Sequence, residues 1–316
     1  MLVIVAPGQG AQTPGFLAPW LELPGFADRL AAWSELAGCD LIRAGTLADA
    51  DEIRDTAVAQ PLLVAAAIAT AEALTGDPVP MKGLTAAIAG HSVGELAAGA
   101  IAGTITAEDA MRLVRVRARG MAAAAAAEQT GMTAVLGGDE EEVLAAISAH
   151  GLTPANVNAA GQIVAAGTLA QLAAFAADPP ARARLRPLSV AGAFHTSHMA
   201  PAVDALAAAA AQVPAADPGL PLLSNLDGAA VGSGTDWLER IVGQVSAPVR
   251  WDQCMQSMAR MGVTAMIELP PAGTLTGLAR RALPGVQLLN LKTPDDLAAG
   301  TAMLAEHADA HADAQA

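Results

Sequence analysis

Two kinds of apolar pattern alternate along the first third of the chain. Short runs of apolar side chains predict buried strands at residues 2–6 and 85–90. Apolar positions with helical spacing predict helices near 25–37 and 59–75, and a longer helix from about 106 to 125. Strands that alternate with helices in this way are typical of a mostly parallel sheet with helices on both faces.

The middle of the chain, between residues 131 and 191, has a more regular succession of short segments. Its pattern predicts strands and helices in the order β-α-β-β-α-β, over 132–137, 139–151, 155–160, 162–167, 169–178 and 186–192. This order is that of a ferredoxin-like α+β unit. Beyond it the larger alternation returns, with helices over 197–212, 235–246 and 251–262, strands over 220–224 and 264–269, and a loop that leads into a helix within 271–283.

These patterns predict a large α/β domain that carries an inserted ferredoxin-like α+β subdomain. We expect the large domain at residues 1–127 and 193–304 and the small subdomain at 128–192. The low-complexity tail, 305–316, is expected to fray.

Composition narrows the functional classes. The 316 residues carry 17 basic and 31 acidic side chains, a net charge of −14, which disfavours nucleic acid and anionic membranes as partners. The longest apolar run, residues 62–74, is too short to span a bilayer and contains Glu72. The two cysteines, Cys39 and Cys254, lie far apart and outside any metal-ligand spacing, so we expect free thiols, no metal site and a cytoplasmic protein.

The strongest chemical signal is the sequence GHSVG at residues 90–94, which fits G-x-S-x-G. It stands between a predicted strand and a predicted helix, the context of a nucleophile elbow. In such a turn the hydroxyl of Ser92 projects over the sheet, and the N–H of Val93 points toward a developing oxyanion. Ser92 is therefore the candidate nucleophile.

A serine nucleophile needs a base, and the histidines supply the candidates. His91 adjoins Ser92, so its side chain points elsewhere, and His150 ends a predicted surface helix. His195 and His198 lie in a loop that follows a predicted strand, where a side chain can reach the carboxyl edge of the sheet. Position alone leaves both of these as candidates, with His195 favoured.

Two further residues stand out near this edge. Gln9 lies in the glycine-rich loop after the first strand, and its N–H is a candidate second oxyanion donor. Arg117 shares a helix face with the apolar side chains of Leu113 and Met121. Such an arginine either extends along apolar surface to solvent or forms a buried clamp for a carboxylate.

Taken together, the motifs resemble the malonyl-CoA:acyl carrier protein transacylase family over the whole chain except the tail. The matching segments are APGQGAQ (6–12), AQPLL (59–63), GHSVGE (90–95), LVRVRARGM (113–121), NAAGQIV (158–164), GAFHTSHM (192–199), QVSAPVRW (244–251) and PAGTLTGL (271–278). In that family a hydrolase-like, mostly parallel sheet domain carries a ferredoxin-like insertion, the same organisation as the pattern predicts.

The resemblance implies catalytic roles for five residues. Ser92 is expected to be acylated, with His195 as the base. Gln9 and Val93 are expected to supply oxyanion N–H groups. Gln244 matches the position whose backbone carbonyl orients the histidine in place of a triad aspartate.

The family resemblance also implies which residues bind the substrate. Arg117 is expected to pair with the free malonyl carboxylate, with Met121 lining that pocket. Asn158 and Gln162 match positions near the cleft. In related polyketide acyltransferase domains AFH accompanies a preference for malonyl, so Phe194 indicates malonyl, although GAFH here departs from the HAFH of those domains.

The implied reaction moves malonyl from malonyl-CoA to the phosphopantetheine thiol of acyl carrier protein, with no further cofactor. The protein is expected to act as a monomer. Local basic clusters are candidate docking surfaces for an acidic carrier, at Arg182, Arg184 and Arg186 or at Arg280 and Arg281. The alternatives are a serine esterase or thioesterase, which would not need Arg117, and an inactive acyltransferase-like scaffold.

Overall fold

The computed structural model describes residues 1–313 except 77, 80 and 82–86, with side chains up to residue 307. The first part of the chain forms β1 (Leu2–Ala6), α1 (Phe26–Ala37), α2 (Leu41–Thr46), α3 (Thr56–Thr75), β2 (Ala87–Gly90), α4 (Gly94–Ile101) and α5 (Ala107–Ala127). The middle part forms β3 (Thr130–Gly137), α6 (Glu140–Ala149), β4 (Thr153–Ala159), β5 (Gln162–Thr168), α7 (Leu169–Ala177) and β6 (Ala183–Pro187). The last part forms α8 (Val203–Ala210), β7 (Leu222–Leu223), α9 (Gly234–Gln244), β8 (Val249–Arg250), α10 (Trp251–Arg260), β9 (Ala265–Glu268), α11 (Thr274–Ala282), β10 (Gln287–Asn290) and α12 (Leu297–Asp313).

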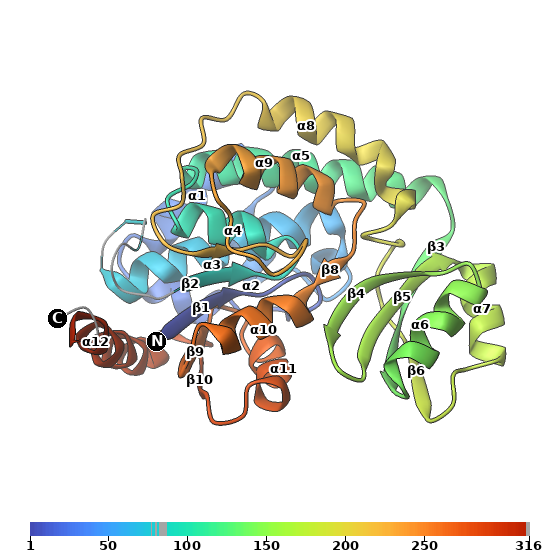
Figure 1. Ribbon diagram of the computed structural model, residues 1–316. Coiled ribbons are helices and arrows are strands. Elements are labelled where there is room, and N and C mark those ends of the chain that lie inside the picture. The colour runs from blue at the N-terminus through green and yellow to red at the C-terminus, as the bar shows by residue number, and fades with distance from the viewer. Residues whose placement is uncertain (77, 80, 82–86, 314–316) are drawn as a thin grey trace.

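The larger sheet is parallel, in the strand order β10-β9-β1-β2-β7 (Figure 1). Alternate residues of β1 enter two different cores. Leu2 and Ile4 join a core with α3, α4 and α5, whereas Val3 and Val5 join a second core with α10 and α11. Because both faces of β1 are buried, all five of its residues are apolar. The predicted α/β class is confirmed.

The second sheet has the order β6-β3-β5-β4-β8. Its first four strands are antiparallel and, with α6 and α7, follow the β-α-β-β-α-β order that the sequence predicts. The fifth strand, β8, comes from the later part of the chain and pairs in parallel with β4, so that Val249 stands opposite Asn156. This pairing ties the second sheet to the segment after α9. The boundaries at 127–128 and 192–193 remain a prediction.

Several predicted elements need correction. The strand expected at 186–192 lies at Ala183–Pro187, where all five residues pair with β3. The exposed side chains of Arg184 and Arg186 interrupt the apolar pattern there. The helix expected from 197 begins as a 3-10 segment, Ser197–Ala202, which contains Pro201.

Other elements escape the sequence pattern. The short elements α2, β8 and β10 were not predicted, and residues 85 and 86 of the expected second strand lie outside the described residues. The tail expected to fray from 305 continues α12 to Asp313, because its alanine-rich sequence has high helix propensity.

The helix α3 is long and apolar enough to cross a membrane by composition alone, with a mean hydropathy of 1.6. However, 83% of that window is buried inside the protein. Such burial is typical of a core helix, and α3 packs here against α5 and α4.

Candidate active site

Ser92 occupies a tight turn between β2 and α4, as the nucleophile-elbow pattern predicts. Its φ of 53° lies in the left-handed region, which is costly for a residue with a side chain. The flanking glycines make this turn possible. A Cβ at Gly90 would collide with the backbone of Gly94, and one at Gly94 would collide with the carbonyl of Ala6. The motif therefore has glycines where neighbouring backbone segments touch.

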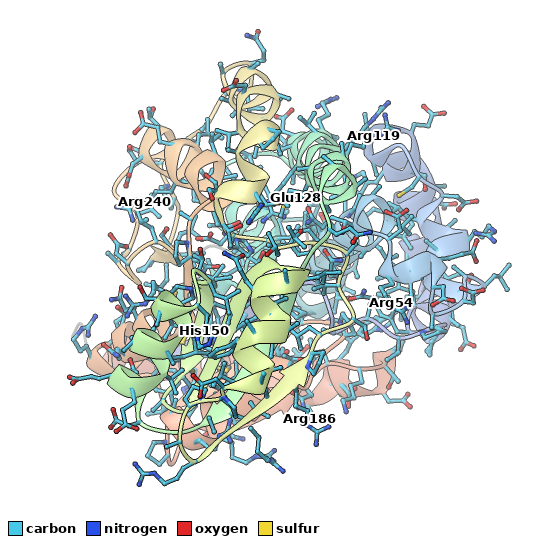
Figure 2. The ribbon with its side chains drawn as sticks, turned by 90° about the vertical axis from the view of Figure 1, so that its right-hand side faces the viewer. Arg54, Arg119, Glu128, His150, Arg186 and Arg240 are labelled. Atoms are coloured by element: carbon cyan, nitrogen blue, oxygen red, sulfur yellow. The ribbon has the colours of Figure 1, made fainter. Side chains whose placement is uncertain are left out.

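The structure places His195, not His198, at Ser92. The Nε2 atom of His195 lies 2.7 Å from Ser92 Oγ, and its Nδ1 lies 2.8 Å from the backbone oxygen of Gln244. His198 instead lies 2.7 Å from the carboxylate of Glu128. Glu128 follows α5 and lies beside the second sheet with its helices (Figure 2). The geometry therefore identifies His195 as the candidate base, a choice that position in the sequence alone did not settle.

His195 is set up as a neutral base. Burial, helped by the nearby Arg117 cation, lowers its pKa to about 3. Since Nδ1 faces a carbonyl oxygen, that nitrogen carries the proton and donates it to Gln244. The lone pair of Nε2 is then directed at the hydroxyl of Ser92, which is the arrangement that general-base catalysis requires.

Arg117 brings a buried cation to the same hydroxyl. The side chain is 1% exposed, and its Nη2 lies 3.3 Å from Ser92 Oγ. Its guanidinium donates to two amide oxygens, Oε1 of Gln60 at 2.6 Å and Oε1 of Gln244 at 2.8 Å. Burial lowers its pKa to about 10, so it remains charged at neutral pH, with the nearby Glu95 opposing the shift.

Arg117 has no carboxylate within ion-pair distance among the described side chains. A buried charge that faces only neutral amides is incompletely compensated. The site therefore suits a small ligand that brings its own carboxylate close to Ser92.

Two backbone N–H groups are free to bind an oxyanion beside Ser92. Neither the N–H of Gln9 nor that of Val93 donates a hydrogen bond to any group in the described part of the chain. Gln9 follows β1, and Val93 precedes α4, at the same edge of the sheet. These groups are the expected oxyanion donors, and that role remains a prediction.

A cavity of about 70 Å³ opens at Ser92 and His195, with Met121 and Phe194 in its wall. It adjoins a cleft of about 410 Å³, since both are lined by Gln9 and other shared residues. The small cavity can hold a short acyl group, and the cleft can admit the arm of a larger thioester.

Asn158 and Gln162 line the larger cleft, where the resemblance placed them. The Oδ1 atom of Asn158 lies 2.9 Å from Nε2 of His91, so the side chain of His91 contacts β4. Gln162 Oε1 accepts a hydrogen bond of 2.9 Å from Arg281. These contacts join the second sheet to the elbow and to α11.

Three polar residues of the site were not singled out from the sequence. Gln60 lies within a matched segment but had no assigned role, and it accepts from Arg117 at 2.6 Å. Asn225 accepts from the N–H of Ser92 at 2.7 Å, and Glu95 accepts from Asn225. The sequence signals for Glu95 were its place in the matched segment GHSVGE and an acid in the first turn of an apolar helix.

Gly192 stands where the related polyketide acyltransferase domains have histidine, and the structure gives a steric reason for this difference. A Cβ on Gly192 would lie 2.6 Å from the Cβ of Ala125 on α5, so this backbone leaves no space for a histidine. The following residue pair, Phe194 and His195, nevertheless reaches the cavity. The change therefore concerns packing against α5, away from Ser92.

Comparisons with known sequences agree with this geometry. The acyl transferase domain profile matches residues 3–294. The malonyl CoA-acyl carrier protein transacylase of Mycobacterium bovis is 55% identical over 297 residues, covering 94% of this chain and 98% of the relative. The enzyme of that name from Escherichia coli strain K12 is 33% identical, covering 93% of this chain and 97% of the relative.

Solved structures of malonyl transacylases are also similar to this chain. The crystal structure of MCAT from Mycobacterium tuberculosis has a TM-score of 0.90 at 53% identity, covering 95% of this chain and 99% of that one. A type II PKS acyl-carrier protein in complex with its malonyl-transacylase has a chain with a TM-score of 0.87 at 28% identity, covering 96% of this chain and 99% of that one. On sequence and on structure, this chain belongs to the acyl transferase family, with the malonyl CoA-acyl carrier protein transacylases as its near relatives.

Proposed function

We propose that this protein transfers the malonyl group of malonyl-CoA to the phosphopantetheine thiol of an acyl carrier protein, through a malonyl-serine intermediate. The product would supply fatty acid synthesis, polyketide synthesis or both. The names of the relatives support this assignment, and one of the solved relatives is a complex with a carrier protein. The proposal includes a cytoplasmic monomer without a resident cofactor or metal.

The observation that carries the proposal is the incompletely compensated charge of Arg117. Its guanidinium lies 3.3 Å from the nucleophilic oxygen and contacts only amide oxygens besides. A malonyl group attached to Ser92 would place its free carboxylate within reach of this cation, whereas an acetyl group has no such charge. Arginine binds carboxylates with two parallel hydrogen bonds, which would also fix the orientation of the acyl group.

In the first half-reaction, the proton of Ser92 Oγ passes to Nε2 of His195 as the oxygen attacks the thioester carbonyl carbon. The resulting oxyanion would receive the N–H groups of Gln9 and Val93. The C–S bond then breaks, and His195 returns the proton to the sulfur of CoA. The carbonyl of Gln244 stabilises the imidazolium between these steps.

In the second half-reaction, the pantetheine thiol of the carrier protein takes the place of Ser92 as the nucleophile. Its proton passes to His195, the sulfur attacks the malonyl-serine ester, and Ser92 leaves with the proton returned. Water competes for the same ester. The cavity of about 70 Å³ leaves little room beside an acyl group, which limits hydrolysis.

The direct test is a transfer assay with purified holo carrier protein and malonyl-, methylmalonyl- or acetyl-CoA. We expect a malonyl adduct on the wild type by intact-protein mass spectrometry, none on S92A, and discharge that depends on carrier protein. Fast discharge by water alone would identify a hydrolase instead. Transfer by S92A at the wild-type rate would refute the mechanism.

The arginines near the cleft are the proposed docking surface for the acidic carrier. Arg184 and Arg186 are exposed on β6, where Figure 2 shows Arg186 at the rim of the second sheet. Arg280 and Arg281 are exposed on α11, and Arg281 bonds to Gln162 in the wall of the cleft. Reversing the charge of both clusters should raise KM for the carrier protein but not for malonyl-CoA, and an unchanged KM would refute this surface.

A further inference from the structure

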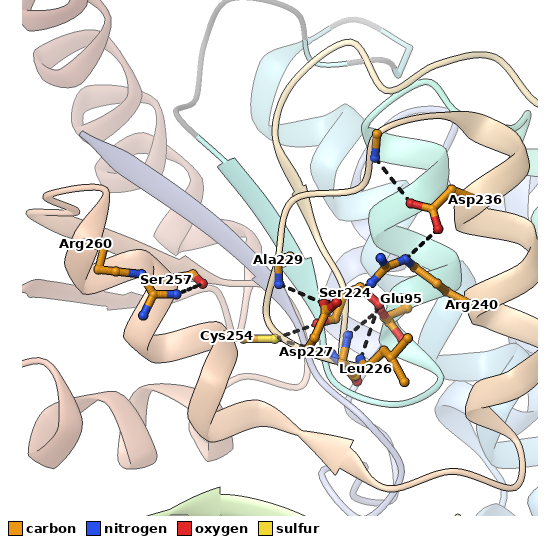
Figure 3. A network of polar contacts seen from close by, with 12 residues as sticks. Glu95, Ser224, Leu226, Asp227, Ala229, Asp236, Arg240, Cys254, Ser257 and Arg260 are labelled. Atoms are coloured by element: carbon orange, nitrogen blue, oxygen red, sulfur yellow. Dashed lines mark hydrogen bonds and ion pairs between the residues drawn. The ribbon is translucent and has the colours of Figure 1, made fainter.

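Glu95 is a buried acid directly beneath the elbow, and the mechanism above does not use it. It lies in the first turn of α4 and is 2% exposed. Figure 3 shows it against the segment that follows β7, among the polar groups around Ser224. Burial raises its pKa to about 8, opposed by its hydrogen bonds and by the Arg117 cation. A carboxyl kept in such a place needs a reason that packing alone does not supply.

One oxygen of Glu95 supports the backbone of the elbow. Its Oε1 accepts from the N–H of Asn225 at 2.8 Å. The side chain of Asn225 accepts from the N–H of Ser92 at 2.7 Å and donates to the carbonyl of Gly90 at 2.7 Å. Asn225 therefore bridges both sides of the strained turn, and Glu95 holds Asn225.

The other oxygen of Glu95 orients the amide of Gln244. Its Oε2 accepts from Nε2 of Gln244, which also donates to the backbone oxygen of Ser92 at 3.1 Å. With the nitrogen held on that side, Oε1 of Gln244 must face Arg117, to which it is bonded at 2.8 Å. In the reversed orientation the amide nitrogen would face the guanidinium, donor against donor.

The two contacts link Glu95 to Ser92, Arg117 and His195. Gln244 also provides the backbone oxygen that binds His195. We propose that Glu95 is a positioning residue, which acts through Asn225 on Ser92 and through Gln244 on Arg117 and His195. The effect of Glu95 on malonyl binding through Arg117 rests on the proposed malonyl transfer, whereas its effect on Ser92 does not.

The test compares Glu95→Gln with a matched control, Glu72→Gln. Glu72 is another buried acid, 7% exposed on α3, whose pKa burial also raises, and it is paired with Arg29 outside the site. Glu95→Gln keeps the size of the side chain but turns one acceptor into a donor, so either Asn225 or Gln244 loses its partner. Melting temperature is measured for both variants.

Two activities are measured for each variant. The first is phosphonylation of Ser92 by a neutral alkyl fluorophosphonate, in which the serine oxygen bonds to phosphorus, fluoride leaves and His195 takes the proton. The second is kcat and KM with malonyl-CoA and holo carrier protein. For folded Glu95→Gln we expect at least a tenfold loss in phosphonylation rate and in kcat, as small displacements of reacting groups produce, with KM changed less than threefold. Glu72→Gln should keep both activities within about twofold.

Wild-type rates in folded Glu95→Gln would overturn the proposal, as would a loss of the same size in Glu72→Gln. If Glu95→Gln does not fold, Glu95→Asp replaces it, because it keeps the carboxyl but withdraws it by one methylene. A tenfold slower phosphonylation of folded Glu95→Asp supports the proposal, and a wild-type rate overturns it. If the wild type reacts with the fluorophosphonate but does not use malonyl-CoA, the proposed function fails while the positioning role stands or falls on the phosphonylation rates.

Discussion

Replacing Arg117 with alanine should change the choice of substrate more than it changes the catalytic machinery. The guanidinium is 1% exposed and uses two of its five N–H donors for amide contacts, which leaves donors for a ligand carboxylate. Hydrogen bonds to a charged group contribute about 1.5–3 kcal/mol each. Two such bonds lost from malonyl therefore correspond to about 3–6 kcal/mol, or about 10²- to 10⁴-fold in kcat/KM.

Acetyl-CoA provides the internal comparison, because its acyl group cannot pair with Arg117. We expect kcat/KM for acetyl-CoA to change less than about tenfold in Arg117→Ala, through loosening of Gln244 and Gln60 alone. The assay measures formation of the acyl-enzyme by rapid quench and mass spectrometry with each thioester. Arg112→Ala is the control, because Arg112 lies on the same helix, is 55% exposed and pairs with Asp109.

Equal losses for the two thioesters would refute the reasoning, since they would assign Arg117 to the structure of the site. Arg117→Lys separates charge from geometry. A lysine restores the cation but not the planar pair of donors. It should therefore recover only part of the malonyl preference, and full recovery would show that two-point binding is unimportant.

Two further predictions concern the base and the pocket. Because the pKa of His195 is held at about 3 and not at the ordinary 6.5, kcat/KM should stay level as pH falls through 6.5. An acid limb near 6.5 would contradict a neutral, buried base. His195 stays neutral in the folded state, whereas in the unfolded state it binds a proton below pH 6.5. The free energy of unfolding should therefore fall as pH drops below 6.5. Urea titrations should show a smaller fall for His195→Gln than for the wild type. Phe194→Ser should enlarge the cavity beside the acyl group and raise the methylmalonyl-to-malonyl ratio of kcat/KM by about tenfold or more; an unchanged ratio would contradict the assigned place of Phe194.

The features that the sequence predicted well are those with a local cause. The apolar run of β1 is visible because both of its faces are buried, and GHSVG is visible because the elbow needs Gly90 and Gly94 where backbones touch. The start of α5, expected at about residue 106, is equally local, since Thr106 accepts from the N–H three residues later. Each of these leaves its signal in a short stretch of sequence, even where the contact that requires it is with a distant residue.

The features that the sequence could not predict depend on distant partners. The strand β8 has two residues and exists only because it pairs with β4 and because Arg250 N–H donates to the carbonyl of Asn225. Asn225 itself is 133 positions from Ser92, and its segment has no motif. The choice between His195 and His198 also needed the fold, or a family resemblance, because both lie in one loop.

The absence of a triad aspartate follows from the place of Arg117. Gln244 meets His195 through its backbone oxygen and Arg117 through its side chain, so the two groups share one neighbour. A carboxylate at this point would pair with Arg117 and compete with the carboxylate of the substrate. The neutral backbone carbonyl of Gln244 orients His195 and leaves Arg117 available to bind the carboxylate of the substrate. Glu95 is compatible with this logic, because the amide of Gln244 lies between its carboxyl group and Arg117.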